Sequence, residues 1–484
     1  MSPAPPCHPR PADRPSSPPC GALQGGGFMS PIGKQNTQRD ALKRSVRLID
    51  LIMLGAGTAI GASVFTVLGP ATSVGGSGIL IATVLAAVPM AVFGIVYAFM
   101  SSTAPKTGAS YAWQHAFVHP LMGFVVAWLR ILGSGAIMVL LARVLVEYLG
   151  MVWPGLPAAP VMLGLFIAVF ALNYFGVSIA ARAQTVLMLL LLAVFAVFVG
   201  VSTPQISIDT IGPVFEGWGP VLAALPLLIN LFLGIETATE VGEEVENAER
   251  NVPVGLVLAL LLTLVVYLSI VVTSLGVAGP KELATSDAPL LTAAEHTLGN
   301  WATPVIVSAA ALALVKSLNA AFLVFTRFLF AMGRNRDLPH FMARVHPRWG
   351  TPHVATVVAF CFASLGLLLS KELLPLLLAV NIPTMMKYFG TCLAGLNVVR
   401  SHPDVYARAR LRFRKAWITT AAVVGMAAAV VITALGWATD WRPYALCGAW
   451  TVVGLLYWWL RRRRSGNWTG PTNAAGTPAS EGAS

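Results

Sequence analysis

The chain has 484 residues, of which 56% are hydrophobic and only 11% are charged, and its formal net charge at pH 7 is +12. Soluble globular proteins carry about 25% charged residues. This composition therefore excludes an ordinary soluble protein and requires lipid as the solvent for much of the surface.

Both ends of the chain differ in composition from the rest. Residues 1–33 are rich in Pro, Gly and Ser and lack the apolar stretch of a secretory signal. We therefore expect a disordered N-terminal tail over residues 1–45 and a disordered C-terminal tail over residues 465–484. Met29 is an alternative start to Met1, and the sequence does not decide between them.

Between the tails, apolar stretches recur at the length of membrane-spanning helices. A helix that crosses the hydrocarbon layer needs about 20 mostly apolar residues. Twelve stretches meet this requirement, so we expect an all-α polytopic membrane protein with 12 transmembrane helices. The expected spans are residues 48–68, 78–103, 120–149, 158–176, 183–201, 219–241, 253–277, 301–331, 353–370, 373–398, 417–437 and 442–460.

The basic residues gather in alternate loops. Lys and Arg cluster before the first span and after the eighth, tenth and twelfth, whereas the loops on the other side hold only Lys281, Lys371 and Arg442. Cytoplasmic loops carry the excess of Lys and Arg, so we expect both termini in the cytoplasm and a location in the inner (plasma) membrane. Charge spread over separate loops is a topology signal, which argues against nucleic-acid binding.

The first and sixth spans contain helix-breaking residues in the same relative place. Gly55, Gly57 and Gly61 cluster in the middle of the first span, and Pro226 and Gly234 interrupt the sixth. Glycine weakens a helix by about 1 kcal/mol, and proline removes a hydrogen bond. We therefore expect both helices to be broken at membrane depth.

A break at membrane depth leaves backbone groups that lipid cannot satisfy. The N-terminal ends of half-helices attract a carboxylate, and unwound carbonyl groups attract an ammonium group. An α-amino acid carries both charges on one carbon, so two facing breaks would hold it. The alternative is that the glycines only allow close helix packing. Two breaks in corresponding halves of the chain favour a binding site.

Four segments resemble motifs of the amino acid–polyamine–organocation superfamily of permeases. GAGTAIGASVF in the first span resembles G-x-G-x-x-I-G-x-G-I-F, and APKTGASYAW (104–113) resembles the loop motif P-x-x-G-G-x-Y. FLGIETATEVGEEVENAERNVP (232–253) and FTRFLFAMGRNRDLPHFMARVHPRWGTPHVA (325–355) resemble the longer motifs of the sixth and eighth spans. The resemblance covers roughly residues 40–415.

The resemblance implies a LeuT-like fold of two inverted five-helix repeats with broken first and sixth helices. We accordingly expect the first repeat over residues 46–201 and the second over residues 202–400. Two additional helices would occupy residues 401–464, which gives the twelve spans counted from hydropathy.

The resemblance also implies that substrate binds on the two unwound segments, with Phe232 or Ile235 covering its side chain. Ser63 departs from the family pattern, because it replaces the usual second glycine of the loop. Either the backbone turns there without a positive φ, or the hydroxyl itself contacts the substrate. The implied substrate-binding residues are Ile60, Gly61, Ala62, Ser63, Val64, Asn230, Leu231, Phe232, Leu233, Gly234, Ile235 and Glu236.

A lysine in the eighth span suggests how transport is coupled to an ion. Proton-coupled members of the family carry a lysine in the fifth span in place of a sodium ion, and the matching residue here is Leu191. The eighth span, which lines the same site in the family, carries Lys316 beside Ser317. We hypothesise that Lys316, Ser317 and Glu236 exchange the coupling proton. The alternative is a structural lysine paired with a carboxylate such as Glu240.

Other ionisable residues also fall within or beside the expected spans. Glu240 and Glu244 continue a helical stripe that begins at Glu236. We expect an aqueous vestibule to hydrate them, and recognition of a second amine is the alternative. Arg130 and Lys387 would face either an anionic group of the substrate or a partner carboxylate.

The sequence thus predicts a secondary active transporter that takes up a neutral amino acid with protons, as a symporter, by alternating access. Exchange of amino acids, or transport of polyamines or small amines, is the alternative. A membrane enzyme would need convergent acid, base or metal groups, and a non-transporting sensor would need a domain to relay its signal. We expect a small-molecule substrate and the lipid bilayer as partners, with no nucleic acid, cofactor or metal.

Overall fold

The computed structural model describes residues 42, 44–286, 288–367, 373–411, 413–439 and 441–464, so most of both expected tails lies outside it. The described part is almost wholly helical. Its α-helices are α2 (Leu48–Ala59), α3 (Ser63–Thr66), α4 (Leu68–Gly75), α5 (Ile79–Thr103), α6 (Ala109–Phe117), α7 (Pro120–Val152), α8 (Ala158–Tyr174), α9 (Val177–Ser202), α10 (Ile208–Ile211), α11 (Trp218–Ile229), α12 (Ala248–Thr285), α13 (Pro289–Leu298), α14 (Ala302–Arg334), α15 (His353–Gly366), α16 (Leu373–Ser401), α17 (Pro403–Ala407), α18 (Lys415–Thr439) and α19 (Arg442–Arg464).

Each expected span overlaps one or more of these helices, and residues 368–370 lie outside the described part. Within the described residues, eight stretches are long and apolar enough to cross a membrane, and α8 and α15 are shorter apolar helices. The protein is therefore a multi-pass helical membrane protein.

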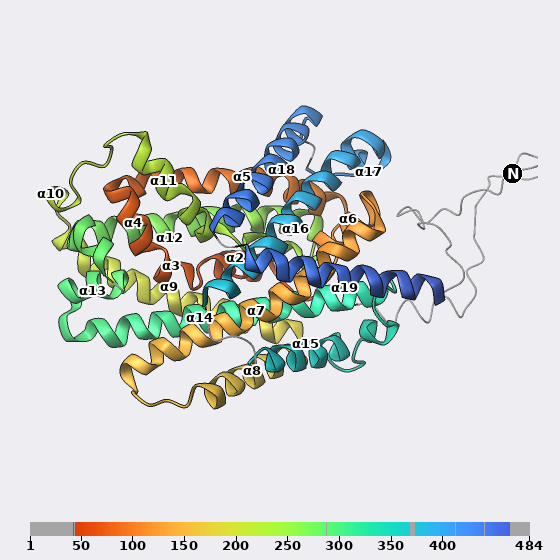
Figure 1. The fold of residues 1–484 in the computed structure, drawn as a ribbon, viewed down its shortest axis with the longest axis horizontal. Coiled ribbons are helices and arrows are strands. Elements are labelled where there is room, and N and C mark those ends of the chain that lie inside the picture. Colours follow the sequence, from red (N-terminus) through yellow and green to blue (C-terminus); the bar gives the residue numbers. More distant parts are fainter. Residues whose placement is uncertain are drawn as a thin grey trace, which may run out of the picture. The chain divides into compact units, whose positions relative to one another are not determined.

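Helix α14 lies within the bundle and packs against α7, α9 and α2. Helix α12 packs against α5 and α2, and α16 packs against α7 and α18. Long helices such as α7, α14 and α12 run in the same general direction (Figure 1). Large apolar side chains such as Val186, Leu261 and Val424 are exposed on the outer helices, as expected for surfaces that face lipid. The broken helix α2 is thereby enclosed by other helices.

The first span is broken at Gly61, as the sequence predicts. Helix α2 ends at Ala59, and Ile60 leaves the helical region with φ −78° and ψ 70°. Helix α3 begins at Ser63, so the chain is not helical for about one turn. Ser63 is not among the residues with positive φ, so the backbone turns there without the conformation that favours glycine.

The other two glycines of this span serve close packing. Gly55 and Gly57 both lie inside α2. A Cβ added to Gly55 would lie 2.9 Å from the Ile235 carbonyl oxygen, and one added to Gly57 would lie 2.7 Å from Gln184 Nε2. Close packing, the alternative role for the glycine cluster, therefore applies to these two positions. It applies to Gly61 as well, where a Cβ would lie 2.7 Å from Ser317 Oγ, but Gly61 also lies at the break.

The sixth span is broken around Gly234. After α11 come a 3₁₀ turn, η3 (Asn230–Phe232), an extended Leu233, and Gly234 with φ +105°. A second 3₁₀ segment, η4 (Ile235–Thr239), continues the span. The expectation that Pro226 also interrupts this helix is wrong, because Pro226 lies inside α11. A proline removes one helical hydrogen bond, whereas the positive φ of glycine changes the chain direction.

Candidate functional site

The two breaks face each other. Ser63, at the start of α3, donates a hydrogen bond from its hydroxyl to the Asn230 carbonyl oxygen in η3, at 3.4 Å. Gly234 lies against α2, since a Cβ at this position would come within 2.7 Å of Thr58 Cγ2. Segments about 170 residues apart in the sequence are thus joined at one place, as the paired helix breaks predict.

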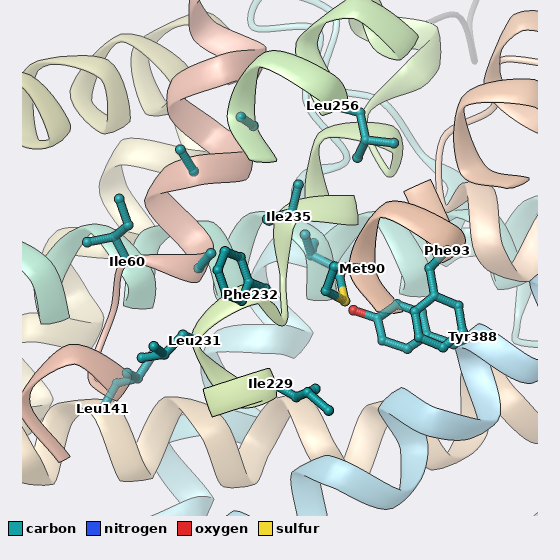
Figure 2. Close-up of a cluster of buried hydrophobic side chains, with 14 of the residues drawn as sticks. Ile60, Met90, Phe93, Leu141, Ile229, Leu231, Phe232, Ile235, Leu256 and Tyr388 are labelled. Carbon is teal, nitrogen blue, oxygen red and sulfur yellow. The ribbon is translucent and has the colours of Figure 1, made fainter. Parts of the chain in front are cut away.

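The predicted substrate-binding residues divide into a buried set and a partly exposed set. Ile60, Gly61, Val64, Leu231, Phe232, Ile235 and Glu236 are buried, whereas Ala62, Ser63, Asn230, Leu233 and Gly234 are partly exposed. Figure 2 shows the large apolar members gathered around the two breaks. The partly exposed set consists mainly of small and polar residues, and it is the part of the site that a ligand reaches first.

Phe232 is fixed inside the apolar cluster. Its ring meets the ring of Tyr267 edge-on, with centroids 5.8 Å apart. The Tyr267 hydroxyl in turn donates to the Ala59 carbonyl oxygen at 2.8 Å. One residue of α12 therefore holds both breaks, through an aromatic contact on one side and a hydrogen bond on the other.

The backbone groups of the first break are only partly satisfied within the protein. The Gly61 N–H donates to the Ala59 carbonyl oxygen at 2.8 Å. Among the described residues, none accepts a hydrogen bond from the Ala62 N–H. N–H groups in the first turn of a helix have no intrahelical carbonyl, so the start of α3 presents donors suited to a carboxylate.

Lys316 of α14 reaches the end of α2. Its buried ammonium group donates to the Gly57 carbonyl oxygen at 2.5 Å and also to the Ile60 carbonyl oxygen. Ser317 adds a hydrogen bond to the Gly57 carbonyl oxygen at 3.3 Å. Within the described residues, Lys316 forms no ion pair, so the alternative pairing with Glu240 is wrong. The cation instead meets the negative end of the α2 dipole.

Leu191, the position that matches the family's fifth-span lysine, is fully buried in the apolar core. It lies on α9, which packs against both α2 and α14. Gln184, also on α9, approaches Gly57 beside Lys316. The structure therefore brings the fifth span, the eighth span and the first break together, as the hypothesis of a displaced lysine requires.

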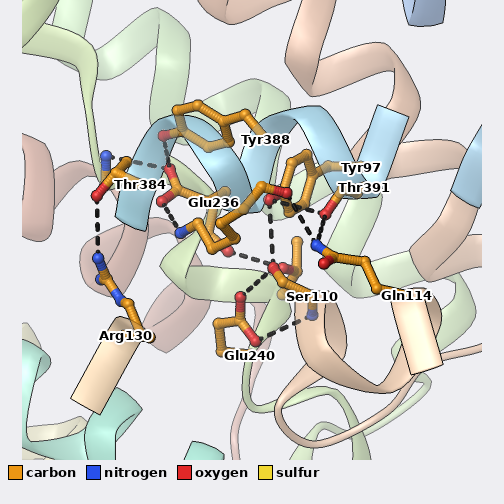
Figure 3. Close-up of polar contacts among 12 residues, drawn as sticks. Tyr97, Ser110, Gln114, Arg130, Glu236, Glu240, Thr384, Tyr388 and Thr391 are labelled. Carbon is orange, nitrogen blue, oxygen red and sulfur yellow. Dashed lines mark hydrogen bonds and ion pairs between the residues drawn. The ribbon is translucent and has the colours of Figure 1, made fainter. Parts of the chain in front are cut away.

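Glu236, just after the second break, is saturated with donors from the protein. Its carboxylate accepts from Lys387 Nζ at 2.5 Å, from the Tyr388 hydroxyl at 2.6 Å and from the Gly234 N–H at 3.0 Å. Figure 3 shows the side chains of α16 converging on this carboxylate. Lys387 thus faces a partner carboxylate, which settles one of the two alternatives for that residue.

Glu240 lies in the same polar cluster but has different partners. It accepts hydrogen bonds from the Ser110 hydroxyl at 2.5 Å and from the Ser110 N–H at 3.3 Å. The Ser110 hydroxyl also lies 3.2 Å from the Tyr97 hydroxyl, which accepts from Thr391 at 3.2 Å (Figure 3). Three helices, α5, α6 and α16, are linked in this way to the segment after the second break.

The end of the bundle beyond this cluster is closed by a buried ion pair. Arg327 donates to Glu244 through Nε and Nη2, both at 2.9 Å. The Glu244 carbonyl oxygen accepts from the N–H groups of Ser45 and Val46, at 2.9 and 3.0 Å. The expectation that an aqueous vestibule hydrates Glu240 and Glu244 is wrong, because both are 0% exposed. Other helices cover the acidic stripe.

Comparison with known proteins agrees with this architecture. Residues 47–469 match the family described as amino acid permease. The chain belongs to the amino acid permease family. It is 33% identical over 323 residues to an uncharacterised transporter of Mycobacterium tuberculosis (strain ATCC 25618 / H37Rv), covering 66% of this chain and 72% of that protein.

Two further relatives of the permease carry specific names. The branched-chain amino acid permease BcaP of Bacillus subtilis is 27% identical over 454 residues, which cover 88% of this chain and 94% of the relative. The cationic amino acid transporter 4, vacuolar, of Arabidopsis thaliana is 25% identical, covering 75% of this chain and 64% of that protein. The two relatives are named for different substrates, so the substrate specificity of this permease has to be inferred from its own residues.

Sequence analysis missed several residues of the permease's polar cluster. Tyr388 and Thr391 follow Lys387 on α16, and Tyr97 lies on α5. Each is a polar group within an otherwise apolar span, and this signal could have found them. Ser110 lay inside a recognised loop motif, but its contact with Glu240 depends on how α6 packs.

Proposed function

We propose that this permease is a secondary active transporter that takes up an amino acid across the inner (plasma) membrane by alternating access. The observation that carries the proposal is the contact between the two broken helices, where Ser63 meets Asn230 at membrane depth. Unpaired peptide groups on facing breaks suit a zwitterion. A neutral amino acid is the proposed substrate class, because both carboxylates near the site already have partners in the protein.

The proposed binding mode follows from the polarity of the backbone at each break. The substrate carboxylate lies at the start of α3, where the Ala62 N–H is available. The substrate amino group lies against the carbonyl groups of η3, between Asn230 and Phe232. The predicted residues of both unwound segments line this site, and Glu236 supports the second segment from behind through its bond to Gly234.

Lys316 is the proposed proton-coupling residue. Its ammonium group is held by two carbonyl oxygens of the first break and by no described carboxylate. Loss of its proton would remove the positive charge and one of the three N–H donors, which would weaken the hydrogen bonds to both carbonyl groups and loosen α14 from α2. Because the same break binds the substrate carboxylate, the protonation state of Lys316 is linked to substrate affinity. Ser317 and Glu236 are the further proposed members of the coupling site.

For the fold we propose the five-plus-five inverted repeat, with repeats at residues 46–201 and 202–400. The eight long apolar stretches and the shorter helices α8 and α15 make ten spans. Helices α16 and α19 bring the proposed number to twelve. Both termini are proposed to be cytoplasmic, from the distribution of Lys and Arg. The end of the bundle closed by Arg327 and Glu244 then faces the cytoplasm.

The test is uptake of labelled amino acids into proteoliposomes, with and without proton and sodium gradients. Uptake of a neutral amino acid that a proton gradient drives, and that Lys316→Met abolishes, supports the proposal. Lys281→Met, at an exposed position, is the matched control and should leave uptake intact. Binding without uptake would show a sensor, and chemical conversion of the substrate would show an enzyme. Uptake that needs substrate on both sides would show an exchanger.

A further inference from the structure

Four ionisable side chains meet near the second break, and three of them have partners. Glu236 pairs with Lys387, and Glu240 is held by Ser110. The fourth, Arg130, comes from α7 and points toward the same cluster (Figure 3). Its charge sits in the apolar middle of a long helix, where an ionised group needs a partner or water.

Arg130 is only partly satisfied by the protein. Its Nη1 donates to Thr384 Oγ1 at 3.0 Å. Its Nε is buried and has no hydrogen-bond partner. Within the described residues, no carboxylate lies within ion-pair distance of the guanidinium group, although the side chain is partly exposed. A guanidinium group offers five N–H donors in a planar fork, so most of its donors are available to a ligand.

The position of Arg130 links it to the proposed substrate site. Thr384, its partner, precedes Lys387 by one turn of α16. Lys387 binds Glu236, which accepts from the Gly234 N–H at the break itself. Figure 2 labels Leu141 of α7 near Leu231 in its view of the same break. Arg130 is therefore connected to the second break through α16 and Glu236.

We propose that Arg130 determines the substrate specificity of the permease by donating to an oxygen atom of the substrate's side chain. The shared chemistry is a side-chain carbonyl oxygen, in a carboxamide or a carboxylate. The same positive charge, next to that of Lys387, excludes substrates with cationic side chains. This inference rests on the proposed function. A carboxamide side chain lies within the neutral class proposed there, and a carboxylate side chain would extend that class to acidic amino acids.

The positive charge of Arg130 disfavours binding of an amino acid with a cationic side chain. A substrate ammonium or guanidinium group in the site would face Arg130, while the two nearby carboxylates are already bound to Lys387, Tyr388 and Ser110. Like charges in a water-poor site repel strongly, and the two described carboxylates there are already bound and do not offset them.

The experiment compares uptake of leucine, glutamine, glutamate and lysine by wild type, Arg130→Gln and Arg130→Lys in proteoliposomes. We expect wild type to prefer glutamine or glutamate to leucine by about tenfold or more, and to reject lysine. Arg130→Gln should lose this preference, retain leucine uptake and allow lysine to compete. Arg130→Lys should keep the rejection of lysine but weaken the preference for side-chain oxygen. The glutamine and glutamate arms distinguish an amide from a carboxylate.

Arg143→Gln is the matched control, because Arg143 is a partly exposed arginine on the same helix. Its substrate preferences should equal those of wild type. The inference is overturned if the leucine-to-glutamine ratio is the same in wild type and Arg130→Gln, or if wild type takes up lysine as well as glutamine. Retained leucine uptake shows that a variant is folded. Absence of all uptake by wild type would instead contradict the proposed function, and this inference with it.

Discussion

The ammonium group of Lys316 lies 2.5 Å from the carbonyl oxygen of Gly57, where the final turn of α2 approaches its break. A side chain of the eighth span therefore supplies hydrogen bonds that the interrupted helix cannot make for itself. Removing this group changes both the stability of the break and its charge, and the two effects can be separated.

Lys316→Gln should separate them. The amide can still donate to a carbonyl oxygen of the break, so we expect a loss of about 1–3 kcal/mol in stability and a folded protein. Proton-driven accumulation should be lost because glutamine does not titrate, while exchange of labelled for unlabelled substrate should persist. Thermal unfolding in detergent and the two transport assays measure these effects. Accumulation at the wild-type level would argue against Lys316 as the coupling residue.

Glu236→Gln should destabilise the protein strongly. The change leaves the Lys387 ammonium group buried without its counter-charge, and breaking one side of such a pair costs about 3–5 kcal/mol. The double variant Glu236→Gln/Lys387→Met removes both charges and should recover much of this loss. Thermal unfolding of the two single variants and the double variant tests the coupling. Additive losses would show that the two side chains do not act as a pair.

Gly234→Ala should impair transport without preventing folding. Gly234 has φ +105°, a conformation that costs an L-residue about 1–3 kcal/mol. The added methyl group would also meet Thr58 Cγ2 at 2.7 Å, so the two breaks would be pushed apart. Gly164→Ala, where a Cβ meets no atom within 4 Å, is the control. Equal uptake rates in the two variants would contradict the role of the break.

Arg327→Lys should loosen the closed end of the bundle. Lysine cannot make the two-pronged contact with Glu244, so one charged hydrogen bond worth about 1.5–3 kcal/mol is lost. In a background without native cysteines, a cysteine at position 110 should then react faster with a soluble maleimide. Arg182→Lys, at an exposed position, should leave the labelling rate unchanged. An unchanged rate in Arg327→Lys would show that the pair does not control access.

Hydropathy and glycine placement were enough to predict a multi-pass helical membrane protein and both helix breaks. Span length is set by the bilayer, and each break falls at a glycine, which weakens a helix by about 1 kcal/mol. Which side chains bind the buried charged residues was not predictable from the same information. The helical stripe of Glu240 and Glu244 was visible, but Arg327 lies 83 residues from Glu244 in the sequence. Whether water or another helix covers such a stripe depends on packing between distant segments.

The charged residues illustrate the same limit. Sequence analysis named Lys316 and Lys387 but gave neither a definite partner. Lys387 binds Glu236 across 151 positions of sequence, and Lys316 binds carbonyl groups rather than any side chain. Main-chain acceptors have no sequence signature, because every residue carries one. Contacts of this kind are therefore found only from the structure.

Glu244 holds the N-terminal segment by its main-chain carbonyl group, which accepts from Ser45 and Val46, and Glu246 donates its own N–H back to Val46 at 3.0 Å. These hydrogen bonds join backbone groups only, so they do not require particular side-chain donors or acceptors. Replacements of Ser45 that keep the N–H would leave these hydrogen bonds in place, and proline, which has no N–H, would remove one of them. Val46 is also buried in an apolar cluster, so a polar replacement there would be costly. The sequence here is therefore constrained at position 46 by packing, and at both positions by the need for a backbone N–H.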